Sequence, residues 1–286
     1  MRRLVIGIVV GLAVIGPSAA AQETERKVIA LTDPARRATL DISLWAGVVN
    51  IVAADAATVV VDGTRVEGTS RADERGRVSK AVPADRSDRA AGLTRLRPST
   101  GVEIDQANNV VTIRGPVGER IDLEIRVPRR TNLKLTKSAP GSPTSPGSVT
   151  VRGVEGDLEV RTNAGSITFI DVSGSVVAHS TNGSVNATVQ HVTADRPMAF
   201  TSYKGIVDVT LPRTLKANLI LQSTRGDVFT DFDVQKHSRG VFSGEAPAAG
   251  GARGTADRQI VAPINGGGPD VELRSYAASI YLRRGN

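Results

Sequence analysis

Residues 162–167 read TNAGSI, and residues 180–185 read STNGSV. Both contain a Ser or Thr three positions before a Gly and a β-branched residue two positions after it. The other copies of the pattern are TSPGSV at 144–149, SYKGIV at 202–207, STRGDV at 223–228 and SYAASI at 275–280, the last with Ala278 in the glycine position. The glycines of the series are Gly147, Gly165, Gly183, Gly205 and Gly226. A near-constant spacing of this kind is typical of a repeat protein.

Between the turns, apolar and polar residues alternate, which is the pattern of a strand with one buried face. Leu158 and Val160 are expected to face inward, while Glu159 and Arg161 face outward. The inward positions of the next strands are Ile167, Phe169, Val176, Ala178, Val185, Ala187 and Val189. Each unit therefore predicts two short strands joined by a Gly-containing turn.

These units predict an all-β chain that forms an elongated two-sided β-solenoid (a single-stranded β-helix) with coils of about 18–22 residues. At the corners, glycine is expected to supply a positive φ, and the Ser/Thr column to bond either the local backbone or the next coil. An antiparallel β-sandwich or meander is the alternative. It explains the even spacing of Gly147, Gly156, Gly165, Gly174 and Gly183 equally well, but not the difference between alternate corners.

The rest of the chain continues the strand pattern, with interruptions. Residues 40–51 align with 219–228, and the longer repeat steps carry insertions around Pro197 and Pro212. Further strands are expected at 58–66, 102–104, 110–114, 121–127 and 132–135. An irregular excursion is predicted at 68–100, with a short helix at 88–97, and a flexible loop at 238–257 before the last coil. Nothing divides residues 22–286 into two domains.

Residues 1–21 have the form of a secretory signal peptide. Arg2 and Arg3 precede an apolar run from Leu4 to Gly16, and residues 19–21 are all Ala, which suits cleavage before Gln22. As a helix, the apolar run would span about 20 Å, less than the roughly 30 Å of a bilayer core. Export is therefore expected, to the periplasm, the outer cell surface or the extracellular space, with no integral membrane span after cleavage. A retained N-terminal anchor is the alternative.

Composition restricts the chemistry. The 286 residues include no Cys, three His and nine aromatics, which excludes disulfides and thiolate chemistry and disfavours an imidazole metal centre. The 3% aromatic content argues against platforms that stack bases or sugars, and bulky rings are expected to fit poorly in a narrow coil. Part of the net charge of +7 clusters in one stretch, interpreted as a solvated strand face and not as a nucleic-acid site. Its members are Arg126, Arg129, Arg130, Lys134 and Lys137.

Several polar residues are candidates for catalysis or metal binding. Glu155, Asp157 and Glu159 are interpreted as a solvated rim rather than an acid/base pair. A hydrolase triad could be composed from His179, His191 and Asp195 with Ser180 or Ser202, but no nucleophile-elbow motif accompanies it. Calcium binding by Asp157, Asp208 and Asp227, and phosphate binding by Gly266–Gly268, lack the required motifs. No catalytic residue, metal or cofactor is expected.

The chain resembles the bacterial putative adhesin domain family of unknown function, which is related to auto-transporter adhesin head domains. The resemblance covers nearly the whole of residues 22–286. It rests on the signal peptide, the strand pair at 40–51, the repeats from Gly147 to Val228, Val127-Pro128 with Asn132-Leu133, and the closing NGGGPDVELR at 265–274. It implies a secreted or surface-exposed β-solenoid and no shared catalytic residues. Ala278 and the long loop at 238–257 depart from the family pattern.

Two functions from different classes follow. The first is an exported non-enzymatic scaffold, an adhesin or cell-envelope interaction protein whose partner is a surface protein, a glycan or an envelope component. The alternative is a carbohydrate-active enzyme, a polysaccharide lyase or hydrolase, built on the same β-solenoid.

Overall fold

The computed structural model describes residues 24–66, 100–138, 147–193, 195–234 and 258–285. All the regular secondary structure in these ranges is β-strand, which confirms the all-β prediction. Within the same ranges, no helix is long and apolar enough to cross a membrane. The predicted signal peptide, the helix at 88–97, the loop at 238–257 and all of the 68–100 excursion except Thr100 lie outside the described residues.

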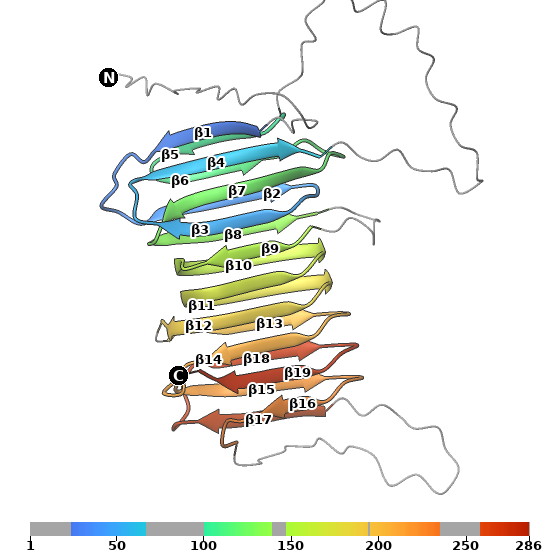
Figure 1. The fold of residues 1–286 in the computed structure, drawn as a ribbon. Helices are drawn as coiled ribbons and strands as arrows, with labels where there is room; N and C mark the ends of the chain where they lie inside the picture. The colour runs from blue at the N-terminus through green and yellow to red at the C-terminus, as the bar shows by residue number, and fades with distance from the viewer. Residues whose placement is uncertain (1–23, 67–99, 139–146, 194, 235–257, 286) are drawn as a thin grey trace, which may run out of the picture.

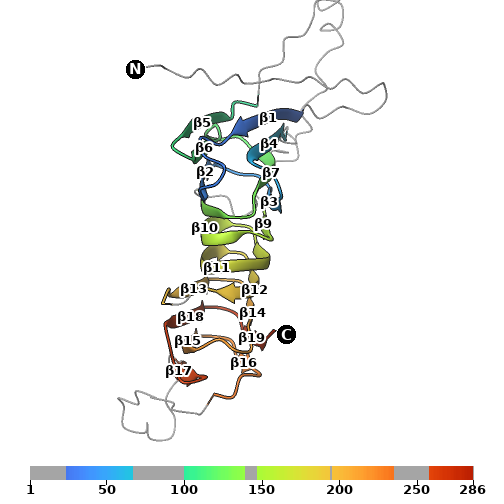
Figure 2. The same cartoon turned by 90° about the vertical axis from the view of Figure 1, so that its left-hand side faces the viewer.

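The strands form two facing layers that run the length of an elongated molecule (Figures 1 and 2). Layer A contains, in spatial order, β5 (Glu103–Ala107), β6 (Val110–Arg114), β2 (Ala38–Leu44), β8 (Thr131–Lys137), β10 (Glu155–Ala164), the second half of β11 (Ile167–Asn182), β13 (Met198–Ser202), β18 (Asp270–Ser275), β15 (Ala217–Ser223) and β17 (Arg258–Ile264). Layer B contains β1 (Thr24–Ala30), β4 (Thr58–Arg65), β7 (Ile121–Pro128), β3 (Val49–Ala54), β9 (Val149–Arg152), the first half of β11, β12 (Val185–Val192), β14 (Val207–Leu211), β19 (Ile280–Arg284) and β16 (Val228–Thr230).

Strands in the repeat region pair in parallel, each with the equivalent strand of a neighbouring coil. Leu158 pairs with Val176, and Ile167 with Val185, so each residue meets the equivalent position of the next repeat. This parallel pairing differs from the antiparallel pairing that the alternative, a meander, would require. Antiparallel pairing among the described strands is confined to the ends of the stack, in β1–β4–β7 and β5–β6 at one end and β15–β17 at the other.

The order of coils in space differs from their order in the chain. The coil β18–β19, which is the last in the chain, lies between β13–β14 and β15–β16. At the other end, β2–β3 lies between β6–β7 and β8–β9. The last coil of the chain is therefore not the last coil of the stack, because a repeat period determines which residues form strands but not which coils become neighbours.

The core lies between the two layers and is filled by the inward residues of both. Leu158, Val160 and Ile167 are buried as predicted. Phe169 and Phe200 are among the largest fully buried side chains, so the expectation that bulky rings do not fit inside the coils is wrong. Two layers facing one another leave enough depth for a ring that lies between them.

The repeat glycines are required mainly because successive coils touch at the corners. A Cβ at Gly165 would lie 2.0 Å from the carbonyl oxygen of Gly147, and one at Gly183 would lie 2.2 Å from that of Gly165. Gly165 has the predicted positive φ (97°), whereas Gly183 does not. The positive-φ explanation therefore applies to Gly165 and is wrong for Gly183. At Gly183, the lack of space between the two backbones excludes a side chain.

We expect Gly183→Ala to lower the free energy of unfolding by about 2 kcal/mol, because the added methyl group must push two coils apart. Gly63→Ala is the matched control, since the atom nearest to a Cβ there would be a side-chain methyl carbon of Leu123 at 3.4 Å, an ordinary van der Waals contact, and the nearest backbone atom, the Glu25 carbonyl oxygen, would lie 3.9 Å away. Chemical denaturation of both variants measures the difference. Equal effects of the two substitutions would contradict the close-contact explanation.

Candidate functional site

A column of buried serines lines the corner at which each layer A strand turns into layer B; we call it the serine corner. Each serine hydroxyl donates a hydrogen bond to a carbonyl oxygen of the neighbouring coil. The distances are 3.1 Å from Ser180 to Gly165, 2.8 Å from Ser202 to Gly183, 3.0 Å from Ser275 to Gly205 and 3.0 Å from Ser223 to Ala278. These bonds join the coils in the direction of the stack.

Three of these hydroxyls, those of Ser202, Ser223 and Ser275, also accept hydrogen bonds within their own corner. The backbone N–H groups of Gly205, Gly226 and Ala278 donate to the serines three residues before them, at 2.8, 3.0 and 3.1 Å. The column thus makes both kinds of bond that the sequence suggested as alternatives. The first copy of the motif, at Thr144, lies outside the described residues.

The hydrolase triad considered from the sequence is not assembled. Ser180 is completely buried, and its neighbour His179 is exposed on the opposite side of the strand. Ser202 likewise points into the corner, where its hydroxyl is already bonded. His191 and Asp195 lie at the end of β12 and in the connection that follows it, at the corner opposite to the serines. Neither His179 nor His191, the two histidines in the described parts of the chain, is therefore placed to act as a base for a serine of this column.

Two of the three acidic rim candidates, Asp157 and Glu159, form ion pairs with arginines. Asp157 contacts Arg196 at 3.0 Å, and Glu159 contacts Arg161 at 2.8 Å. Within the described ranges, no three His, Asp or Glu side chains lie close enough together to hold a metal ion. Gly266 and Gly267 have positive φ values in the turn before β18, as the turn interpretation requires.

The interpretation of the basic cluster as a solvated strand face is wrong for Lys137. Lys137 lies in the serine column, in register with Thr162, and its side chain is buried. Its ammonium group donates hydrogen bonds to the carbonyl oxygens of Gly47, at 3.3 Å, and Gly147. Burial, reinforced by the positive charge of Arg120, lowers the pKa of Lys137 from 10.5 to about 8, while Asp122 opposes the shift.

Other members of the cluster are paired on the surface. Arg126 contacts Glu124 at 2.8 Å, and Arg129 contacts Asp55 at 3.4 Å. This fits the interpretation of a solvated strand face for these two side chains.

Four aromatic rings gather at the surface of the last three coils of the stack, and with two arginines they form what we call the aromatic surface. Tyr203 and Tyr276 follow column serines of adjacent coils, and their rings stack at 4.6 Å. Phe229 and Tyr281 pair on layer B, and their rings stack at 5.0 Å. The guanidinium groups lie over two of these rings, Arg225 at 5.2 Å from Tyr276 and Arg283 at 5.7 Å from Tyr281.

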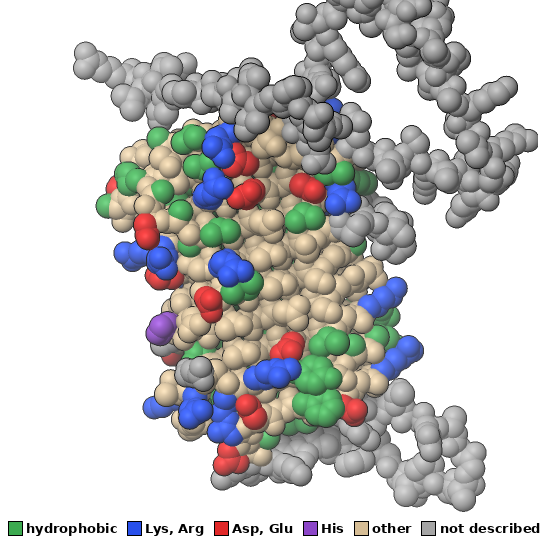
Figure 3. All heavy atoms as spheres, viewed as in Figure 1, with side chains coloured by type: hydrophobic (Ala, Val, Ile, Leu, Met, Phe, Trp, Pro, Cys, Tyr) green, Lys and Arg blue, Asp and Glu red, His purple; other side chains and the backbone are tan. Residues whose placement is uncertain are grey.

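Three of these rings are well exposed, with 47% of Tyr203, 37% of Tyr276 and 49% of Phe229 open to solvent. Figure 3 shows hydrophobic side chains gathered beside charged ones over the lower strands of layer B. The low aromatic content, which argued against platforms that stack bases or sugars, did not indicate this cluster, because a chain with few aromatics can still concentrate them. The signal in the sequence was the Tyr that follows the column serine in both SYKG and SYAA.

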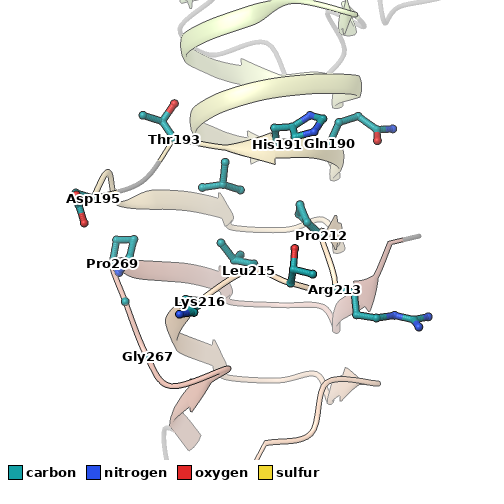
Figure 4. A pocket seen from close by; sticks show the side chains of 13 residues that line it. Gln190, His191, Thr193, Asp195, Pro212, Arg213, Leu215, Lys216, Gly267 and Pro269 are labelled. Atoms are coloured by element: carbon teal, nitrogen blue, oxygen red, sulfur yellow. The ribbon is translucent and has the colours of Figure 1, made fainter.

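A surface depression with a volume of about 910 Å³ lies at the corner opposite to the serines. Figure 4 shows Leu215 near its middle, with Pro212 and Arg213 on one side and Pro269 and Asp195 on the other. The other lining residues are Gln190, His191, Val192, Thr193, Thr214, Lys216, Gly267 and Gly268. The depression lies where the two longer repeat steps insert residues. The sequence showed these insertions, but it did not show that they border a depression.

Comparison with known proteins supports a family for part of the chain. Residues 141–251 match the family described as Toastrack DUF4097. The match confirms the resemblance to a domain family of unknown function over a shorter stretch than the sequence suggested. A search of curated proteins finds no match.

Two solved structures are similar to the chain at low identity. A "putative cell adhesion protein" from Clostridium sporogenes has 9% identity and a TM-score of 0.45, covering 92% of this chain and 100% of that one. A "putative adhesin" from Bacteroides fragilis has 9% identity and a TM-score of 0.40, covering 92% of this chain and 98% of that one.

Lys137 predicts a pH dependence of stability. Between the folded pKa of about 8 and the ordinary value of 10.5, the unfolded chain holds a proton that the folded chain has lost. Stability should therefore rise with pH in this window, by at most about 1.4 kcal/mol per pH unit, and this group should add no pH dependence below it. Lys137→Met removes the group. Denaturant titrations at pH 7 to 10 should show the wild type gaining stability relative to the variant, and parallel pH profiles would contradict the assignment.

Proposed function

We propose that this chain, whose residues 141–251 match the Toastrack family, is an exported, non-enzymatic β-solenoid scaffold that binds a component of the cell envelope or surface, as an adhesin does. The aromatic surface is the observation that carries this proposal. Exposed aromatic side chains are costly in water when they cluster, and such clusters mark interaction sites.

The composition of the aromatic surface favours binding over chance exposure. Tyr and Arg dominate the residues that contribute most to protein interfaces, since each buries a large area and also offers polar groups. Tyr203 and Tyr276 are held parallel, with an interplanar angle of 3°, and Arg225 lies over the second ring. Because the rings are already stacked, little conformational freedom is lost when a partner covers them.

The coil stack supports the scaffold part of the proposal. Parallel pairing of equivalent positions in successive repeats, as between Leu158 and Val176, is what a two-sided solenoid requires. The serine column and the close backbone contacts at the corners make each coil a rigid support for the next. Regular outer faces on such a support are suited to extended partners.

The N-terminal sequence supports export. Arg2 and Arg3, the apolar run that follows and the Ala-rich segment before Gln22 together form the signal-peptide pattern. N-terminal sequencing of the protein purified from its own cells tests cleavage, and a chain that starts at Met1 would contradict it.

Removing the exposed rings should weaken surface binding. We expect Tyr203→Ser with Tyr276→Ser and Phe229→Ser to lower the affinity of residues 22–286 for washed cells at least tenfold. Val28→Ser with Val110→Ser is the matched control, since these side chains are also exposed, at 43% and 38%, but lie at the other end of the stack. Titration of fluorescently labelled protein against cells gives the affinities, and thermal unfolding checks that each variant is folded.

The outcomes separate the two functional classes. Equal binding by the triple variant and the wild type would overturn the role of the aromatic surface. Cleavage of acidic polysaccharides by the purified chain, detected as new reducing or unsaturated ends, would overturn the non-enzymatic part of the proposal.

A further inference from the structure

The depression at the corner opposite to the serines is shaped by two loops that the repeat does not need. The connection from β12 to β13 contains Asp195 and Pro197, and the connection from β14 to β15 contains Pro212 and Arg213. The second loop is held by Asn265, whose side-chain amide donates to the carbonyl oxygens of Arg213 at 2.9 Å and Leu215 at 2.7 Å. A turn bond of 3.0 Å from the Leu215 N–H to the Pro212 carbonyl also stabilises it. The wall of the hollow that this second loop forms is therefore held in place without a ligand, as small-molecule sites usually are.

The middle of the depression is apolar. Val192 and Leu215 are partly buried and pack against the main core. Leu215 lies near the centre in Figure 4, between Pro212 on one side and Pro269 on the other. A volume of about 910 Å³ falls within the range typical of small-molecule sites. An inorganic ion gains nothing from such an apolar surface, whereas a hydrocarbon chain or ring would gain by leaving water.

The rim carries basic side chains that no acidic group neutralises. Arg213 and Lys216 border the depression, and neither forms an ion pair with any acidic side chain in the described parts of the chain. Asp195, the acidic residue of the lining, lies on the other side from Arg213 (Figure 4). Two unpaired cations at an apolar hollow are complementary to an anionic head joined to an apolar body.

We infer that this depression binds a monomeric amphiphilic anion, with its hydrocarbon part over Leu215 and Pro269 and its anionic head at Arg213 and Lys216. The site is separate from the aromatic surface and goes beyond the proposed function, because the depression lies at the corner of the coils opposite to the serines and the stacked tyrosines.

Octyl phosphate, kept below its micelle concentration, is a suitable probe of this site. Isothermal titration calorimetry with residues 22–286 should show octyl phosphate binding at least tenfold more tightly than octyl glucoside, which has the same tail and no charge. The affinity for octyl phosphate should also exceed the affinity for inorganic phosphate, which has the anionic head without the tail, by at least tenfold. Both differences in affinity are required, because the proposal needs the apolar middle of the depression and the two cations together.

The double variant Arg213→Gln with Lys216→Gln should weaken octyl phosphate binding at least tenfold and leave thermal unfolding unchanged. Arg152→Gln is the matched control, since Arg152 is an exposed arginine on β9. The proposal is overturned by equal binding of octyl phosphate and octyl glucoside, by equal binding of octyl phosphate and inorganic phosphate, or by an unchanged affinity in the double variant. Binding to phosphatidylglycerol vesicles without binding to octyl phosphate would also overturn it, in favour of a membrane surface. None of these results depends on whether the aromatic surface binds cells.

Discussion

The direct contact between backbones at the serine corner is the constraint on which the stack depends. Gly183 rests against Gly165, and Gly165 against Gly147, with no room for a Cβ between them. The buried hydroxyl of Ser180 then bonds the Gly165 carbonyl, so the backbone brought close by glycine does not lose its hydrogen bond. Glycine therefore permits this close approach of the coils, and serine compensates the buried carbonyl. The backbone hydrogen bonds between parallel strands then align the inward aliphatic residues of successive coils.

Much of this arrangement could be predicted from the sequence, because contacts between adjacent coils recur at a short, nearly constant period. The strands, their inward residues and the serine column follow from that period. The pairing of Ser223 with Ser275 does not, since the long segment between them interrupts the repeat. Lys137 was missed for another reason. A lysine in a serine column shares the position but not the residue type, and only burial reveals its role.

Both surfaces with binding potential lie in the part of the stack where the repeat carries insertions. The aromatic surface uses the serine corner and layer B, and the depression uses the loops at the opposite corner. The central coils, with equal steps and no insertions between Gly147 and Gly183, supply rigidity instead. Composition could not locate either surface, because a percentage of aromatics or a net charge says nothing about where those side chains meet.

Deletion of one complete coil tests the corner constraint most directly. Removing residues 165–182 joins Ala164 to Gly183 and restores the motif TNAGSV at the junction, so β12 should pair with β9 and β13 with β10. Thermal unfolding followed by circular dichroism should show a folded β-protein with a single cooperative transition. Deletion of residues 174–182 alone should not fold, because it makes two layer B strands consecutive in the chain. If the whole-coil deletion variant is unfolded, or if the two deletion variants behave equally, the claim is contradicted that the corner contacts define one coil as the structural unit of the stack.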